Sequence, residues 1–187
     1  MNITESTTLL NLSWLLKRPW RLVAFGFGSG LSQLAPGTVG TLWAWAFALI
    51  LGALFPNWPP LDIAILLLIG FLLGIWACGK TGEELGVFDH SGMVWDEVIA
   101  FWIILFFVLP GGWLLQSSAF ILFRFFDIVK PGPIGWVDAF FKEWKPEGFL
   151  GQWPNTFRGF GVMIDDLLAA FFTLLVMAIF KHWGFYS

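Results

Sequence analysis

Residues 159–180, GFGVMIDDLLAAFFTLLVMAIF, form an apolar stretch long enough to cross a bilayer, and Asp165 and Asp166 lie inside it. A charge within hydrocarbon costs roughly 2.5–3.5 kcal/mol on insertion scales, so an uncompensated acidic pair should not persist there. A bound divalent cation is the simplest compensation. The stretch therefore predicts a membrane helix with a functional acidic pair.

Four other apolar stretches precede it; two of them also carry acids, besides Asp62 at the edge of a third. Asp96 and Glu97 lie near the start of one stretch, and Asp127 lies near the end of the next. Turn-forming clusters rich in Pro and Gly, or polar connectors, separate the stretches. The five predicted membrane spans are residues 38–55, 61–78, 93–109, 113–129 and 159–180.

The composition agrees with a membrane protein. Of 187 residues, 58% are hydrophobic and 12% are charged, and the mean hydropathy is +0.77. We expect one all-α integral membrane domain over residues 1–187, with an interfacial helix within the first twenty residues. A net charge of −3 offers no basic surface, which argues against nucleic acid as a partner.

The basic residues predict the orientation. If the five spans alternate in direction, all ten Lys and Arg residues except Lys181 fall on one side of the membrane. By the positive-inside rule that side is cytoplasmic, with the N-terminus inside and the C-terminus outside. This topology brings all five carboxylates to a similar depth near the cytoplasmic face.

The acidic pairs have the chemistry of a Mg²⁺ site. Adjacent helical residues point about 100° apart, so at most one member of each pair faces a common centre. Carboxylate oxygens are hard ligands that Mg²⁺ accepts, with room for waters and phosphate oxygens. The candidate metal ligands are Asp96, Glu97, Asp165 and Asp166.

Arg124, Asp127 and Lys130 are spaced as helical neighbours before Pro131, which ends the helix. They form either a local ion-pair ladder or a phosphate site in which Arg124 and Lys130 contact the substrate. Both interpretations stay open at this point.

A Gly-rich segment on the same side precedes the first span. Segments of this kind are more often turns or close packing sites, but their backbone N–H groups and hydroxyls could also hold a phosphate or a glycerol headgroup. The candidate residues are Gly28, Ser29, Gly30, Ser32 and Thr38.

Asp89 and His90, just before the third span, are either a solvated loop pair or candidates for a ligand or for proton transfer. Other phosphatase and hydrolase chemistries are disfavoured, because the chain has no Cys-x₅-Arg, Asp-x-Asp or Gly-x-Ser-x-Gly pattern and only two histidines.

Four separated blocks of the chain resemble the phosphatidylglycerophosphatase A family of bacterial membrane lipid phosphatases. They are GFGSGLS at 26–32 with PGT at 36–38, the segment from DH at 89–90 to VWDE at 94–97, FRFFDIVKP at 123–131, and GVMIDD at 161–166. The stretch 144–158 is longer and richer in Trp and Pro than the family pattern leads us to expect.

The resemblance implies Mg²⁺-dependent hydrolysis of a membrane phospholipid, phosphatidylglycerophosphate, at the inner face of the bacterial cytoplasmic membrane. In this interpretation the acidic pairs hold the metal, Arg124 and Lys130 offset phosphate charge, and Asp89 or His90 transfers a proton. Asp127 is a further catalytic candidate, as a nucleophile or otherwise.

Two other functions stay in competition. A small ion or proton-coupled transporter would use acids within helices, but the outer halves of the spans are almost wholly apolar. A phospholipid headgroup transferase would share the acid cluster, but the spacing of acidic residues typical of such enzymes is missing.

Overall fold

The computed structural model describes residues 10–143 and 154–185, and within these ranges every regular element is a helix. The elements are α1 (Leu12–Leu16), α2 (Pro19–Ala24), the 3₁₀ helix η1 (Gly26–Leu31), α3 (Pro36–Leu54), α4 (Pro60–Leu85), α5 (Trp95–Val108), α6 (Trp113–Val129), α7 (Pro133–Glu143) and α8 (Pro154–His182). The predicted all-α class is correct for the described residues.

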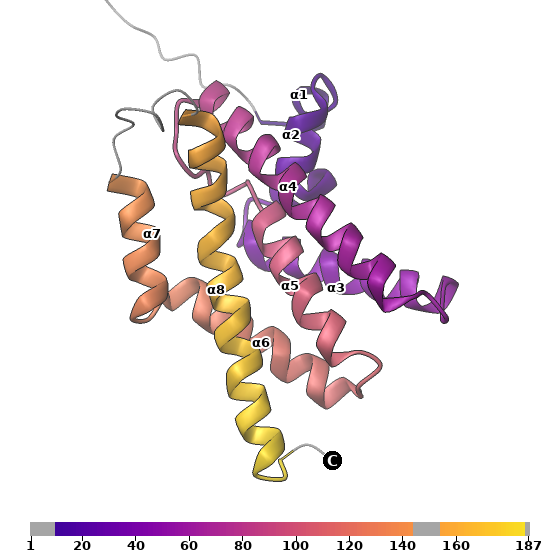
Figure 1. Cartoon of the computed structure of the whole chain (residues 1–187). Coiled ribbons are helices and arrows are strands. Elements are labelled where there is room, and N and C mark those ends of the chain that lie inside the picture. The colour runs from indigo at the N-terminus through magenta and orange to yellow at the C-terminus, as the bar shows by residue number, and fades with distance from the viewer. Residues whose placement is uncertain (1–9, 144–153, 186–187) are drawn as a thin grey trace, which may run out of the picture.

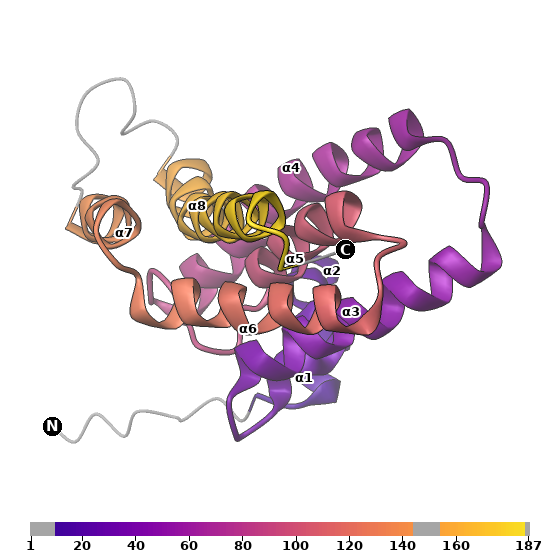
Figure 2. The same cartoon turned by 90° about the horizontal axis from the view of Figure 1, so that it is seen from below.

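Helix α5 lies at the centre of the bundle. It packs against α3, α4, α6 and α8, and Figures 1 and 2 show these four helices around it. Its sequence is apolar on nearly every side, and Val98, Ile99 and Phe101 are completely buried. A helix that is hydrophobic all round belongs in the middle of a bundle. The first turn of α5, with its two acids, is therefore held at a fixed place in the core.

Helices α4 and α8 make the most extensive contact in the structure, and glycines allow it. A Cβ on Gly159 would overlap the backbone carbonyl of Ile75, and a Cβ on Gly79 would overlap that of Asn155. Small residues let two helix backbones approach closely. This contact fixes the height of α8, and with it the height of Asp165 and Asp166.

The helix that contains the second predicted span is longer than the sequence suggested. The connector expected from residue 79 onward is helical as far as Leu85, and the helix ends at Gly86, whose φ of +68° suits a glycine cap. The polar side chains of this last part are compensated at the surface. Glu84 pairs with Arg21 of α2 at 2.6 Å.

Three helices, α3, α4 and α8, are long and apolar enough to cross a membrane. Helices α5 and α6 have 14 and 17 residues, or about 21 and 26 Å, which is less than the roughly 30 Å of a hydrocarbon core. The described residues thus support a membrane protein with three crossing helices. The predicted count of five crossings is not established.

Helix α7 was not predicted as a helix. It begins at Pro133, a residue favoured in the first turn, and it buries Ile134 and Phe141 against the bundle. In Figure 1 it lies beside the first half of α8. The N-terminal segment contains the short helices α1 and α2, and its interfacial position stays a prediction. Residues 144–153 of the unusual stretch 144–158 lie outside the described residues.

Candidate active site

Three carboxylates far apart in the sequence meet in the structure. Glu97 comes from the first turn of α5, Asp127 from the last turn of α6, and Asp166 from the first half of α8. One oxygen of each lies within 4.8 Å of the others. Asp127 and Asp166 are only 8% and 3% exposed. We call these three residues the carboxylate triad.

Arg124 neutralises one side of the triad. Its Nη1 lies 2.7 Å from Oδ2 of Asp127 and 3.1 Å from Oε1 of Glu97. The same nitrogen donates a hydrogen bond of 3.3 Å to Thr41 Oγ1, and that hydroxyl donates to the carbonyl of Gly37. The guanidinium is thereby held between α3, α5 and α6, so its charge has a defined position.

A second ion-pair group lies beside the triad. Lys130 pairs with Asp165 of α8 and also contacts Asp138 of α7 at 2.9 Å, while Lys142 reaches Asp138 at 2.9 Å. Lys130 is placed for this by a left-handed backbone turn, φ +45°, at the end of α6. The chain therefore holds two cations, Arg124 and Lys130, next to its buried acids.

The charges of this group reinforce one another. Burial alone would lower the pKa of Lys130, but the charge of Asp165 together with hydrogen bonds to Asp138 and Asp165 raises that pKa above its ordinary value. Burial alone would raise the pKa of Asp138, but hydrogen bonds from Lys130 and Lys142 hold it below its ordinary value. Both side chains are therefore charged at neutral pH.

The acidic centre keeps unused ligand capacity. Glu97 Oε2, Asp165 Oδ1 and Asp166 Oδ2 are buried and have no hydrogen-bond partner among the described residues. Buried carboxylate oxygens without partners are costly. Hard oxygens of this kind suit Mg²⁺, so the donor set fits the predicted cation.

The two members of each adjacent acidic pair have different partners. Glu97 and Asp166 belong to the triad, whereas Asp165 faces Lys130 and Asp96 Oδ1 accepts the backbone N–H of Glu97 at 2.9 Å. Asp127, predicted as a catalytic residue, lies in the triad. Of the four candidate ligands, the structure thus brings two together with Asp127.

The Gly-rich segment is folded back on itself. Ser29 Oγ donates to the carbonyl of Gly26, and Ser32 Oγ donates to that of Leu34, both at 2.8 Å. Gly28 has φ +105°, and Gly30 packs against the backbone of Gly92. The two hydroxyls therefore donate to carbonyls of the loop itself. The segment forms one wall of a small pocket.

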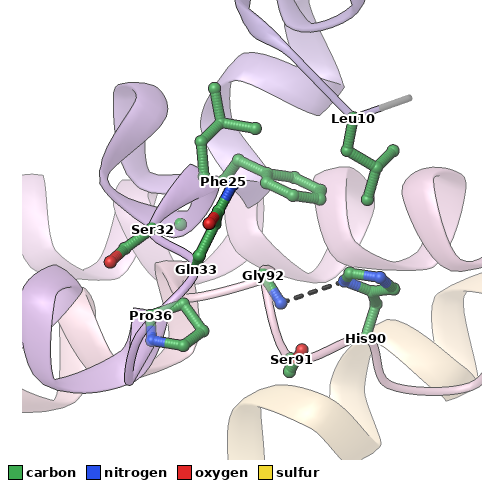
Figure 3. Close-up of a pocket in the computed structure, with 10 residues that line it drawn as sticks. Leu10, Phe25, Ser32, Gln33, Pro36, His90, Ser91 and Gly92 are labelled. Atoms are coloured by element: carbon green, nitrogen blue, oxygen red, sulfur yellow. Dashed lines mark hydrogen bonds between the residues drawn. The ribbon is translucent and has the colours of Figure 1, made fainter.

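Other predicted residues lie around the triad. Thr38 is half-buried in the first turn of α3, one turn before Thr41, and Asp89 is an exposed loop residue. His90 lines a pocket together with Phe25 and Pro36 (Figure 3). These residues are near the acidic centre in the fold but are not part of it.

Sequence reasoning missed two polar residues of the site, Thr41 and Asp138. Thr41 lies three residues after Thr38 on the same helix face. Asp138 precedes Lys142 by one helical turn, a spacing that could have indicated both α7 and its ion pair.

The arrangement can bind a phosphomonoester. Carboxylates for a cation, a fixed guanidinium and a lysine are the groups that hold phosphate oxygens and offset their charge. One of the helices that carry these groups, α8, is long and apolar enough to cross a membrane. A lipid phosphate is therefore a suitable ligand for this site.

Comparisons with known proteins agree with this chemistry. The model of the family described as phosphatidylglycerophosphatase A matches residues 22–181. The chain is 35% identical over 169 residues to phosphatidylglycerophosphatase A of Escherichia coli, covering 90% of this chain and 87% of the relative. It is 39% identical over 184 residues to the phosphatidylglycerophosphatase A of Haemophilus influenzae, covering 97% and 99%.

A Bacteroides thetaiotaomicron protein, provisionally named a phosphatidylinositol-3-phosphatase, is 37% identical over 162 residues, covering 84% of this chain and 91% of the relative. No solved structure matches the chain. The matched region contains the whole carboxylate triad with Arg124 and Lys130. The chain belongs to the phosphatidylglycerophosphatase A family.

Proposed function

We propose that this chain removes the terminal phosphate of phosphatidylglycerophosphate, giving phosphatidylglycerol and inorganic phosphate in phospholipid biosynthesis. Its family is one of lipid phosphatases. The observation that carries the proposal is the convergence of Glu97, Asp127 and Asp166, from three helices, beside Arg124.

In this proposal Glu97, Asp127 and Asp166 hold Mg²⁺, and Asp96 and Asp165 support them from the adjacent positions. The unpartnered oxygens of Glu97 and Asp166 favour this set. When bound, Mg²⁺ supplies charge neutralisation at phosphate oxygens and a water of lowered pKa. The placement of Asp127 among these acids favours a ligand role over covalent attack on phosphorus.

Arg124 and Lys130 bind the transferring phosphate and stabilise the charge that builds on its oxygens. Their fixed positions favour this, because donors that are already oriented cost no reorganisation during the reaction. Each is at present shared between carboxylates, so a phosphate would compete with the pairs to Glu97 and Asp165. Asp89 is exposed beside the site and could carry the proton to or from bulk water.

The site faces the cytoplasm of the bacterial inner membrane in this proposal. Figure 1 shows the end of α4 beside the beginning of α8. Arg21 pairs with Glu84 at this end of α4, and Lys80 follows Gly79, which packs against Asn155 of α8. Lys181 lies in the last turn of α8. Helices α5 and α6 are the third and fourth of five crossings, or a hairpin that enters and leaves on the same side. Since a hairpin and a double crossing both return the chain to its starting side, the C-terminus is outside either way.

Phosphate release from phosphatidylglycerophosphate in detergent tests the proposal. We expect release that requires Mg²⁺ and stops with EDTA, and a loss of about 10²-fold or more in Asp166→Asn, because one member of the metal set is gone. Asp62→Asn is the matched control, since Asp62 is exposed at the opposite end of α4.

Two results would count against the proposal. Full activity in Asp166→Asn would exclude the triad, and equal inactivity of Asp62→Asn would point to general damage. Because the Bacteroides relative carries an inositol-lipid name, phosphatidylinositol 3-phosphate belongs in the substrate panel with phosphatidic acid. Preference for either of these lipids would change the substrate without changing the chemistry.

A further inference from the structure

A small pocket next to the triad has no part in the function as proposed so far. It has a volume of about 130 Å³ and lies between the Gly-rich segment and the loop that leads into α5. Its walls include Phe25, Ser32, Pro36 and His90 (Figure 3). Pro36 is followed by Gly37, whose Cα faces the Glu97 carboxylate so closely that a Cβ would overlap Oε1. The pocket and the acidic centre thus share the first turn of α3.

The walls of the pocket are firmly packed. Gly30 and Gly92 lie backbone to backbone, with no space for a Cβ on either. The rings of Phe25 and His90 are 5.8 Å apart between centroids, and the N–H of Val94 bonds to the carbonyl of Ala24. The pocket therefore exists before a ligand arrives.

The hydrogen bonding of His90 defines what the pocket offers. The backbone N–H of Gly92 donates to His90 Nδ1 at 3.0 Å, as Figure 3 shows. A nitrogen that accepts this bond carries no proton, so the bond assigns the proton of the neutral ring to Nε2. Within the described residues Nε2–H has no protein partner, so His90 presents a donor.

The size and charge of the pocket indicate its ligand. A dry cavity of about 150 Å³ accommodates benzene, a ligand of six heavy atoms, so this pocket suits a group of that size. Glycerol also has six heavy atoms. The described lining residues include no Lys, Arg, Asp or Glu, which favours a neutral hydroxyl-bearing group over a second phosphate.

The surroundings favour a lipid over a soluble polyol as the source of that group. Leu34, next to the pocket in sequence, is 83% exposed, and Phe27 is 50% exposed. Apolar side chains exposed around a polar site are typical of a membrane interface.

We propose that the pocket is a subsite for the glycerol of the substrate headgroup, and that His90 Nε2–H donates a hydrogen bond to its hydroxyl. The inference rests on the proposed function, because it assigns one part of the same substrate. It gives His90 a role in substrate selection in place of proton transfer.

The test compares phosphatidylglycerophosphate with an analogue in which hydrogen replaces the free hydroxyl of the headgroup glycerol. For the wild-type enzyme we expect kcat/KM to be about three- to tenfold lower on the analogue, the size of one net hydrogen bond. His90→Asn keeps an oxygen for the Gly92 N–H but is too short to reach the position of Nε2. In His90→Asn the two lipids should have nearly equal kcat/KM, mainly because the KM for the natural lipid rises.

His90→Gln is the matched variant, because its amide nitrogen reaches the position of Nε2, and it should retain most of the discrimination. The inference is wrong if the wild type does not distinguish the lipids, or if His90→Asn keeps the wild-type ratio. It is also wrong if both variants lose kcat equally on both lipids, as a proton-transfer role predicts. If the wild type releases no phosphate from either lipid, the proposed function itself fails. If His90→Asn does not fold, the wild-type ratio still tests the subsite, because a ratio of one would exclude it.

Discussion

Arg124 on α6 and Glu97 on α5 form an ion pair of 3.1 Å with both side chains mostly buried, 13% and 14% exposed. The pair joins the end of one helix to the start of another at the level of the acidic triad. Because Arg124 also contacts Asp127, a single cation compensates two buried carboxylates. Arg124 thus compensates part of the buried negative charge, and an added cation would compensate the rest.

Replacing Arg124 should reveal this shared role. Removing one partner of a buried pair costs about 3–5 kcal/mol, since the remaining charge is left uncompensated. We expect Arg124→Ala to unfold at a lower temperature in detergent and to lose most phosphate release. Arg124→Lys should recover stability more than activity, because it keeps the charge but loses the planar fork. Equal recovery of both would mean that the fork has no part in phosphate binding.

Binding of Mg²⁺ should stabilise the fold. A ligand that binds only the folded state adds about 2.7 kcal/mol at a hundredfold excess over its Kd, which raises the unfolding temperature. We expect this rise for the wild type and not for Glu97→Gln, which loses a triad oxygen. Glu143→Gln, at the exposed end of α7, is the matched control. An undiminished Mg²⁺ response in Glu97→Gln would remove Glu97 from the metal set.

Asp138 should matter for the reaction although it lies on a helix that the sequence did not reveal. It is a second partner of Lys130 beside Asp165, so Asp138→Asn should let Lys130 move. We expect kcat/KM to fall by about ten- to hundredfold, the size of one hydrogen bond to a charged group, and Asp138→Glu to recover part of it. Lys142→Gln removes the other partner of Asp138. Because the Lys142 side chain is 43% exposed, this variant should change kcat/KM little. Equal losses in the two variants would indicate that α7 as a whole is disturbed.

The helices of the bundle could be predicted because apolar stretches end at Pro and Gly clusters. The rotation of each helix could not, because it depends on packing against neighbours. The sequence left open which member of each acidic pair faces the centre. The structure points Glu97 and Asp166 toward Asp127 and leaves Asp96 and Asp165 with other partners. A rotation of about 100° would exchange the members of a pair, and no local pattern encodes it.

The errors at α4 and α7 have a common physical cause. Both segments are rich in polar residues, and the sequence gives no sign that another helix compensates them. Glu84 at the end of α4 is paired with Arg21, and Asp138 of α7 is paired with Lys130. Ion pairs to other elements thus compensate charges in helical segments that hydropathy assigns to loops. The apolar face of α7, with Ile134 and Phe141, was the available signal.

The α4–α8 contact should be sensitive to the addition of a single methyl group at one of its glycines. Gly159→Ala places a methyl group against the carbonyl of Ile75, and the two backbones must move apart. We expect a loss of about 1–3 kcal/mol, typical of overpacking, despite the higher helix propensity of Ala. Gly52→Ala is the control, because a Cβ there meets nothing within 4 Å. Thermal inactivation in detergent measures both, and similar inactivation temperatures would show that the glycine contact is not tight in the membrane protein.

The orientation of the protein in the membrane can be tested with cysteines placed near the C-terminal ends of α7 and α8. Helix α8 has 29 residues, about 44 Å, so its ends project beyond a hydrocarbon core of about 30 Å. Cysteine placed at exposed Lys181 should react with a membrane-impermeant maleimide in intact cells that have a permeabilised outer membrane. Cysteine at exposed Lys142 should react only after the inner membrane is opened. The native Cys78 is 1% exposed and should stay unlabelled, which provides the background. Labelling of the Lys142 position from outside would invert the topology, and it would place the acidic centre and its headgroup pocket on the outer face.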